Sequence, residues 1–426
     1  MAHRGFLLQP TYRVESGVPV LHLWGVLEAG GSFLIRDDRT RPRFWIRADD
    51  AETAAARGAT VVPDAPARRT LAGEPALTVE VTRPPDVPPL RQRLAGAGVA
   101  TFEADVRFAY RALIDRGIRG ALEIRQEGEP GDGVGRVFRN PDVAPARWHP
   151  RLSVLSIDIE TDPDARRLLS VALEGCGASE VLLWTPEGLP CPDGATPCAS
   201  QEELLATFAR RVRELDPDVL TGWNVVDFDL EVLHRLTERT GRSLDLGRGA
   251  APAVRLRPSN APGMRFDATV PGRVVLDGIQ LVRGAFLRYD SYSLDFVARA
   301  VLGEGKTMTG ESRVEAILEA FRSDRERLVD YNRNDARLVL DILERLRLVD
   351  LAVERSLLTG MPPNRVAASI ASFDFLYLTE LGKRGIVAPS VEGSTSSLPQ
   401  SGGHVLEPEP GLHDNVLVLD FRSLYP

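Results

Sequence analysis

Short alternating runs of apolar and polar residues occupy the first third of the chain. Charged or Gly-rich turns separate these runs, which lie at 12–14, 18–24, 32–35 and 44–46. Short apolar runs separated by such turns predict β-strands paired through the turns. A short helix is expected near 90–94, and the Gly-, Pro- and Arg-rich segment 128–150 is expected to be loop and linker. The pattern therefore predicts a β-rich N-terminal domain over residues 1–150.

From residue 151 the pattern changes to strands that alternate with helices. Apolar and β-branched runs predict strands at 152–157, 169–173, 181–184, 218–222 and 274–276. Two capping boxes, Ser200 with Glu203 and Ser323 with Glu326, precede apolar residues spaced by three and four. Each box predicts the start of a helix, and the second helix is expected to run to about residue 346. We therefore expect an α/β domain over residues 151–348.

The last part of the chain predicts a different organisation. A helical pattern to about residue 385 and a Ser-, Gly- and Pro-rich stretch after it assign residues 349–410 to a helical segment and linker. The run 416–420 is apolar and ends in an acid, so residues 411–426 are expected to begin a further domain with a strand. The expected fold class is α/β within an α+β multidomain chain.

Composition and charge narrow the classes of function. Hydrophobic residues make up 43% and charged residues 26%, an ordinary globular balance. A net charge of −8 argues against a uniformly basic protein that coats DNA, but it allows a basic groove on an acidic body. Only Lys306 and Lys383 are lysines, and the other basic residues are arginines. Because no apolar run approaches the roughly 20 residues that span a bilayer and no secretory signal is recognisable, we expect a cytoplasmic protein with no membrane partner.

Two carboxylates lie at the end of the strand expected at 152–157. Asp158 and Glu160 are two residues apart, so they share one face of a strand, while Ile157 and Ile159 point to the other. Adjacent like charges need a neutralising partner, and carboxylate oxygens suit Mg²⁺ or Mn²⁺. The alternative is a strand end with solvated acids, and this segment alone leaves both open.

Acids also follow two later elements. Asp227 and Asp229 come after the strand expected at 218–222, where each could point into a site at the sheet edge or cap a helix, and the spacing does not choose between them. Tyr331 and Asp335 are four residues apart in the last long helix, so they share a face. The alternative there is a core tyrosine and an aspartate at the rim.

Together these acids indicate a centre for two metal ions. Four carboxylates can hold two ions about 3.5–4 Å apart, the geometry for in-line attack at phosphorus, and a tyrosine hydroxyl can orient the attacking water. The sequence offers no convincing nucleophilic triad and no GxxxxGK[ST] phosphate loop. The set therefore predicts a metal-dependent reaction at a phosphate group.

The same segments resemble the three exonuclease motifs of the family B DNA polymerases, of the bacterial polymerase II type. Asp158-Ile-Glu160-Thr161 resembles the first motif, Asn224-Val-Val-Asp-Phe228-Asp229 the second, and Tyr331-Asn-Arg-Asn-Asp335 the third. Further segments also resemble this family, so the resemblance covers nearly the whole chain; they are residues 102–107, 113–118, 291–306, 373–390 and 402–403.

The resemblance implies a ribonuclease H-like 3′→5′ proofreading exonuclease that acts on DNA. It implies two Mg²⁺ or Mn²⁺ ions held by four ligands, Asp158, Glu160, Asp229 and Asp335. It favours Asp229 over Asp227 and implies a catalytic role for Tyr331. DNA contacts are expected at three further residues, Asn224, Thr161 and Phe228.

The last seven residues resemble polymerase motif A, in which Asp420 would bind the catalytic metals and Tyr425 would exclude the ribose 2′-OH. Because the sequence stops at Pro426, we expect an N-terminal part of a polymerase that does not polymerise alone. The implied partners are primer–template DNA and single-stranded 3′ ends, with dNTPs only in the full-length polymerase. A monomer is expected, and a processivity factor is not readable from the sequence. Two alternatives are a stand-alone 3′→5′ nuclease and a catalytically silent DNA-binding fragment.

Overall fold

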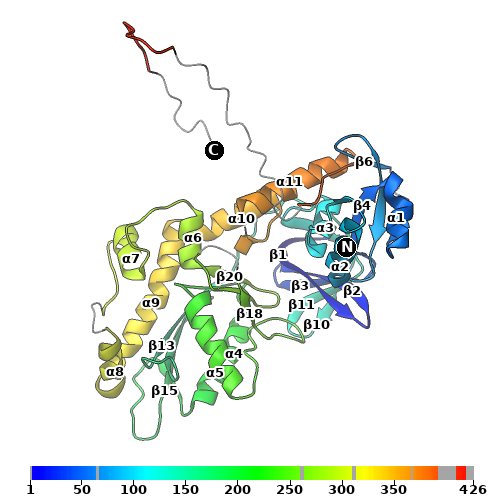
Figure 1. Ribbon diagram of the computed structural model, residues 1–426. Helices are drawn as coiled ribbons and strands as arrows, with labels where there is room; N and C mark the ends of the chain where they lie inside the picture. Colours follow the sequence, from blue (N-terminus) through cyan, green and yellow to red (C-terminus); the bar gives the residue numbers. More distant parts are fainter. Residues whose placement is uncertain are drawn as a thin grey trace. The chain divides into compact units, whose positions relative to one another are not determined.

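The computed structural model describes residues 2–63, 67–259, 263–308, 313–365, 368–391 and 409–418. The chain divides into two compact units, Met1–Ser390 and Val391–Pro426. Figure 1 shows the first unit, in which strands dominate the N-terminal part and helices cover a sheet in the later part. The described residues confirm the expected mixture of a β-rich part, an α/β part and a helical segment.

Two sheets form the N-terminal part of the first unit. The larger has the strand order β10-β11-β3-β2-β1-β9-β12. Its strands are β1 (His3–Glu15), β2 (Val18–Leu27), β3 (Ser32–Asp37), β9 (Ala121–Arg125), β10 (Glu129–Gly131), β11 (Val134–Arg139) and β12 (Asp142–Pro145). The smaller has the order β21-β6-β7-β4-β8, with β5 also paired to β7. Its strands are β4 (Arg43–Arg47), β5 (Thr60–Val62), β6 (Arg68–Thr70), β7 (Pro75–Glu80), β8 (Thr101–Phe102) and β21 (Ile386–Val387).

The expectation of loop and linker over 128–150 is wrong, because β10, β11 and β12 lie within that segment. Strand β11 runs parallel to β3, with Phe138 opposite Ile35. Phe138 is fully buried and packs in the same core as Phe33. The Gly and Pro content suggested turns, whereas β11 pairs both with the adjacent β10 and with β3, about 100 residues away in the sequence, and β12 pairs with β9.

Short helices pack against the N-terminal sheets. They are α1 (Ala51–Ala56), α2 (Val87–Ala95) and α3 (Phe108–Arg116), with single 3₁₀ turns η1 (Ala48–Asp50) and η2 (Pro84–Asp86). The helix expected near 90–94 is α2, and its Leu90 and Leu94 are buried. Helix α3 ends at Gly117, whose φ of 65° is the left-handed conformation that terminates many helices.

A third sheet, in the order β16-β15-β14-β13-β17-β20, forms the centre of the α/β part. Its strands are β13 (Val154–Thr161), β14 (Leu168–Gly175), β15 (Ala178–Trp184), β16 (Ala195–Cys198), β17 (Val219–Gly222) and β20 (Val274–Asp277). Strand β13 lies in the interior of this sheet, antiparallel to β14 and parallel to β17. A separate hairpin joins β18 (Arg255–Pro258) to β19 (Phe266–Thr269).

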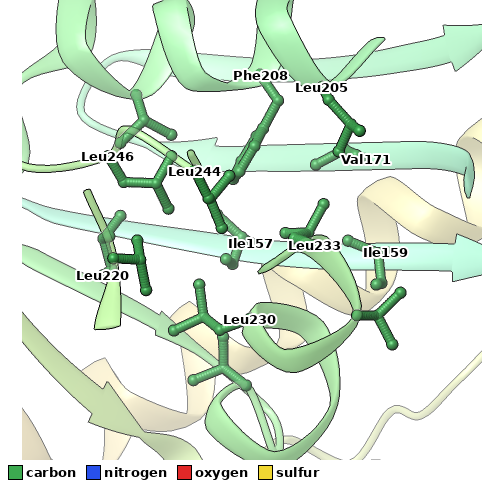
Figure 2. Close-up of a cluster of buried hydrophobic side chains, with 14 of the residues drawn as sticks. Ile157, Ile159, Val171, Leu205, Phe208, Leu220, Leu230, Leu233, Leu244 and Leu246 are labelled. Carbon is green, nitrogen blue, oxygen red and sulfur yellow. The ribbon is translucent and has the colours of Figure 1, made fainter. Parts of the chain in front are cut away.

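Helices surround this sheet. They are α4 (Gln201–Leu215), α5 (Glu231–Arg239), α6 (Gly278–Gly284), α7 (Leu294–Leu302), α8 (Arg313–Ser323) and α9 (Arg325–Arg345), together with the π-helical turn η3 (Val226–Leu230). Among them, α7 packs on α9 rather than on a strand. Figure 2 shows Ile157 and Ile159 of β13 among apolar side chains of α4 and α5, including Phe208 and Leu233. Because strand side chains alternate, Asp158 and Glu160 are left for the opposite face, which α9 covers.

The first of the two capping boxes predicted its helix start correctly, and the second was wrong by one residue. Ser200 caps α4 and accepts a hydrogen bond from the Glu203 amide at 3.1 Å, as expected. Helix α9 starts one residue later than the second capping box implied, because Asp324 is its cap and accepts from the Arg327 amide at 3.2 Å. Ser323 is instead the last residue of α8. One helix therefore ends and the next begins at the point where the sequence predicted only the start of a helix.

The chain then returns to the N-terminal sheets. Helix α10 (Leu348–Thr359), the turn η4 (Pro363–Arg365) and helix α11 (Ser369–Lys383) lead to β21, which pairs with β6. The Ser390 hydroxyl accepts a hydrogen bond from the Ala104 amide at 2.8 Å. Residues 369–390 therefore contact the part of the chain expected to fold as 1–150, and the predicted domain boundaries stay predictions.

In the second unit only residues 409–418 are described. The strand expected at 416–420 is not formed at 416–418, where the three side chains are exposed and no strand neighbours them among the described residues. Asp420 and Tyr425 lie outside the described residues. No helix in the described ranges is both long and apolar enough to cross a membrane.

Candidate active site

Three carboxylates from two distant segments meet between β13 and α9. Each of Asp158, Glu160 and Asp335 offers one oxygen, and these oxygens all lie within 4.8 Å of one another. Asp335 has no solvent exposure and Glu160 is 9% exposed. The alternation of β13 supplies the first two acids, and the buried face of α9 supplies the third. The structure therefore brings together three of the four expected metal ligands.

Asn332 fixes the position of Asp158 within this cluster. Its side-chain amide donates hydrogen bonds to the Asp158 carboxylate at 2.7 Å and to the Asp158 carbonyl oxygen at 3.1 Å. Asn332 is completely buried one turn before Asp335 on α9. This contact sets the register between the helix and the strand, and the sequence analysis missed it. The available signal was a second polar residue beside Tyr331 on a helix face that is otherwise apolar.

The two acids that spacing alone could not separate have different partners. Asp229 reaches β13, where its carboxylate accepts a hydrogen bond from the Ile159 amide at 3.1 Å. Asp227 instead accepts from the Arg265 and Phe266 amides at 2.8 and 3.0 Å, at the start of β19. Asp229 therefore lies beside the carboxylate cluster, whereas Asp227 anchors a hairpin.

Burial raises the pKa of Asp229 well above its usual range, and the neighbouring Asp158 carboxylate raises it further. A buried acid beside another acid is stable when a proton or a cation neutralises the pair. This charge arrangement is what a divalent cation would relieve, because carboxylate oxygens are hard ligands. The residues present thus fit a divalent metal ion.

Lys306 is a second residue that the sequence analysis did not assign to the site. Its ammonium group forms an ion pair with Asp335 and donates a hydrogen bond to the Tyr331 hydroxyl at 3.1 Å. The structure thereby connects Tyr331 to the carboxylates through the lysine. The available signal was compositional, since Lys306 is one of only two lysines in a chain that otherwise uses arginine.

The three residues expected to contact DNA lie at the end of β13 and in the segment that follows β17. Asn224 is exposed, with a left-handed φ of 62°, two residues after the end of β17. Phe228 is 41% exposed on η3, one residue before Asp229. The Thr161 hydroxyl, at the end of β13, donates to the Asp162 carbonyl oxygen at 2.9 Å. Their roles as DNA contacts stay predictions.

Comparison with known proteins identifies the family. The family model "DNA polymerase family B, exonuclease domain" matches residues 184–297, and "DNA polymerase family B" matches residues 367–426. DNA polymerase II of Escherichia coli (strain K12) is 35% identical over 342 residues, which is 79% of this chain and 42% of that protein. The chain belongs to the family B DNA polymerases. The resemblance inferred from the motifs is therefore confirmed.

Archaeal members of family B match a longer part of the chain. A DNA polymerase of Thermococcus sp. (strain 9oN-7) is 29% identical over 450 residues, covering 99% of this chain and 53% of that protein. The solved structure of the family B DNA polymerase from Pyrobaculum calidifontis superposes with a TM-score of 0.74 at 26% identity, covering 96% of this chain and 54% of that one. The chain thus spans about half the length of each of these three relatives.

Proposed function

We propose that the carboxylate cluster hydrolyses the 3′-terminal phosphodiester bond of DNA, as the 3′→5′ proofreading exonuclease of a family B DNA polymerase. One observation carries the proposal. Carboxylate oxygens of Asp158, Glu160 and Asp335 gather within 4.8 Å although Asp335 lies more than 170 residues after the other two. The alternative for Asp158 and Glu160 was a strand end with solvated acids. That alternative does not account for a buried third acid contributed by another element.

The residues have separable roles in this proposal. Asp158, Glu160, Asp229 and Asp335 would hold two Mg²⁺ or Mn²⁺ ions. Bound ions of this kind lower the pKa of water and stabilise negative charge on the leaving 3′ oxygen. Tyr331 orients the attacking water through its hydroxyl. Lys306, which already reaches Tyr331 and Asp335, places a positive charge where the scissile phosphate would lie.

The substrate is a single-stranded 3′ end frayed from a primer–template. Asn224 and Thr161 would hold the terminal nucleotide, and the exposed ring of Phe228 would stack on a base. A mismatched end costs less free energy to unpair than a matched one, so mismatches enter the site more often without any readout of the base. Contacts with phosphates make binding weaken as salt rises.

The wider assignments follow the family. We propose that the chain acts on DNA in the bacterial cytosol, as a monomer. We propose that Asp420 and Tyr425 are motif A residues that serve the metals and dNTP of the polymerase reaction. These two residues lie outside the described ranges, so their assignment rests on sequence similarity alone.

The proposal is tested by cleavage of a 5′-labelled primer that carries a 3′ mismatch on its template. With Mg²⁺ the 426-residue chain should release single 3′ nucleotides, faster from mismatched than from matched ends, and EDTA should stop the reaction. Asp158→Ala should lose most cleavage, whereas Asp193→Ala, which removes an exposed acid, should not.

Two outcomes would contradict the proposal. Cleavage by Asp158→Ala at the wild-type rate would place the chemistry elsewhere. Binding of DNA by a folded wild-type chain without any Mg²⁺-dependent cleavage would favour a catalytically silent DNA-binding protein. Circular dichroism of each variant separates loss of the site from loss of the fold.

A further inference from the structure

Lys306 is held in place by a carboxylate on a neighbouring helix. The Asp295 side chain on α7 accepts a hydrogen bond from the Lys306 backbone amide at 2.8 Å. Its second oxygen accepts from Arg299 Nε at 3.0 Å, one turn later on the same helix. One carboxylate therefore joins the C-terminal end of the loop 303–306 to the body of α7.

The Asp295 carboxylate leaves no space for a side chain at position 305. A Cβ atom built on Gly305 would lie 2.3 Å from Asp295 Oδ1 and 2.9 Å from Arg299 Nε. The φ of Gly305 is not in the left-handed region, so close approach of the Asp295 carboxylate is the reason that glycine fits here. The carboxylate thus passes directly over the loop backbone to reach the Lys306 amide.

The helix that carries Asp295 is itself attached to the helix that carries Asp335. Leu294 and Val297 of α7 pack with Val339 and Ile342 of α9 in one buried cluster. Helix α7 therefore presents the loop to α9 from a fixed position. At the other end of the loop, Arg337 of α9 forms two parallel hydrogen bonds with Glu304, at 3.0 and 3.1 Å.

The two anchors differ in strength. The Glu304–Arg337 pair is about 54% and 37% exposed, and ion pairs this open to solvent contribute little. The Asp295 side chain is 29% exposed, and its bond to a backbone amide is assisted by a full negative charge. Hydrogen bonding from Arg299 lowers the pKa of Asp295, so the carboxylate is ionised at neutral pH.

We propose that Asp295 is a positioning residue for exonuclease cleavage, which acts by holding the Lys306 backbone so that the lysine ammonium reaches Tyr331 and Asp335. This inference rests on the proposed function. Asp295 does not touch the substrate in this account. Its effect passes through the loop, and Gly305 allows the close contact that transmits it.

The test measures two quantities at saturating Mg²⁺: the single-turnover rate of cleavage of single-stranded DNA with enzyme in excess, and the KM for the same DNA under multiple turnover. Asp295→Ala should lower the rate about tenfold with the KM for DNA nearly unchanged. Asp295→Asn keeps an oxygen that accepts the Lys306 amide, so it should restore most of the rate. Gly305→Ala should behave like Asp295→Ala. Arg299→Ala, the matched control, removes only the second partner of Asp295 and should remain near wild type.

A double variant distinguishes positioning from a general loss of stability. Asp295→Ala combined with Lys306→Ala should be no slower than Lys306→Ala alone, because both act through one ammonium group. Hydrogen exchange at the Lys306 amide should quicken in Asp295→Ala and stay protected in Asp295→Asn. Rates that multiply in the double variant, or wild-type cleavage by Asp295→Ala, would overturn the inference.

Failure of the proposed function gives a different pattern. If the wild-type chain does not cleave DNA, or if Lys306→Ala cleaves at the wild-type rate, the proposed role of the site or of its lysine is wrong and the positioning role falls with it. If wild type cleaves and Lys306→Ala is slow while Asp295→Ala is unchanged, the exonuclease proposal stands and only the role of Asp295 is rejected.

Discussion

Asn332 and Asp158 are 174 residues apart in sequence, yet one side-chain amide binds both the carboxylate and the carbonyl oxygen of the aspartate. This pair joins α9 to β13 at the point where their acids meet. Strand β13 determines the face of the sheet on which Asp158 lies. The Asn332 contact determines where α9 lies along that face, and therefore where Asp335 meets Asp158. The geometry of the carboxylate cluster therefore depends on a residue that is not itself a metal ligand.

Asn332→Ala should weaken cleavage about tenfold or more, because a hydrogen bond to a charged group contributes about 1.5–3 kcal/mol. It should also lower the melting temperature, since the amide is buried. Single-turnover cleavage and thermal denaturation measure the two effects. Asn334→Ala is the matched control on the same helix, because Asn334 contacts Arg337 rather than Asp158. Equal cleavage by both variants would contradict the role of Asn332.

Asp229→Asn should abolish cleavage and yet raise the melting temperature in EDTA at pH 7. The pKa of Asp229 is raised by burial and by Asp158, so its ionised form is disfavoured in the folded metal-free protein. An uncharged amide removes that penalty. Asp227→Ala should do the opposite, lowering the melting temperature through lost backbone hydrogen bonds at β19 while cleavage remains. Reversed results would exchange the roles of the two acids.

Asp277 should make metal-free stability fall as pH rises from about 4 to about 6. Burial raises its pKa to about 6 from an ordinary value of 3.8, even though it caps α6 by accepting from the Ile279 amide at 3.0 Å. The folded state therefore holds the Asp277 proton more tightly than the unfolded state does. The resulting stabilisation of the folded state is fully present below about pH 4 and is lost as the pH rises through about 6. The shift corresponds to about 3 kcal/mol.

Urea unfolding at pH 4 and pH 7 measures this dependence against Asp277→Asn, which cannot ionise. The free energy of unfolding of the variant relative to wild type should increase by up to about 3 kcal/mol between the two pH values. Comparing the variant with wild type at each pH cancels the other titrating groups. A difference that does not change with pH would show that Asp277 has an ordinary pKa.

Lys306→Ala should shift the Mg²⁺ dependence of cleavage to lower concentration and reduce the maximum rate about tenfold. The lysine ammonium is paired with Asp335, so removing it leaves more negative charge for a divalent ion. The lower maximum reflects loss of the positive charge near the phosphate. A titration of rate against Mg²⁺ separates the two effects. Lys383→Ala, which removes the only other lysine from an exposed pair with Glu380, should change neither.

Much of the candidate site could be predicted from local periodicity. A period of two placed Asp158 and Glu160 on one face of β13, and the i to i+4 spacing placed Tyr331 with Asp335 on α9. The choice between Asp227 and Asp229 could not be made from spacing, because η3 is a π-helical turn and neither strand nor helix periodicity describes it. Family resemblance favoured Asp229, which is the one beside β13.

What could not be predicted depends on contacts between distant segments. Strand β11 was missed because it also pairs with the distant β3, and β10 and β12 were missed because Gly and Pro suggested turns, although their partners β11 and β9 lie close by in the sequence. Lys306 was missed because it lies in a loop, where no periodicity indicates the direction of a side chain. Its reach to Asp335 depends on Asp295, which no local pattern connects to it.

The most direct test of the central claim follows a 5′-labelled single strand in Mn²⁺, with wild type and Asp335→Asn compared on the same gel. Asp330→Asn, an exposed acid on the same helix, is the control. Because Asp335 completes the carboxylate cluster, wild type and Asp330→Asn should shorten the strand one nucleotide at a time, and Asp335→Asn should not. Equal shortening by Asp335→Asn, or shortening that persists in EDTA, would contradict a metal-dependent exonuclease built on Asp158, Glu160 and Asp335.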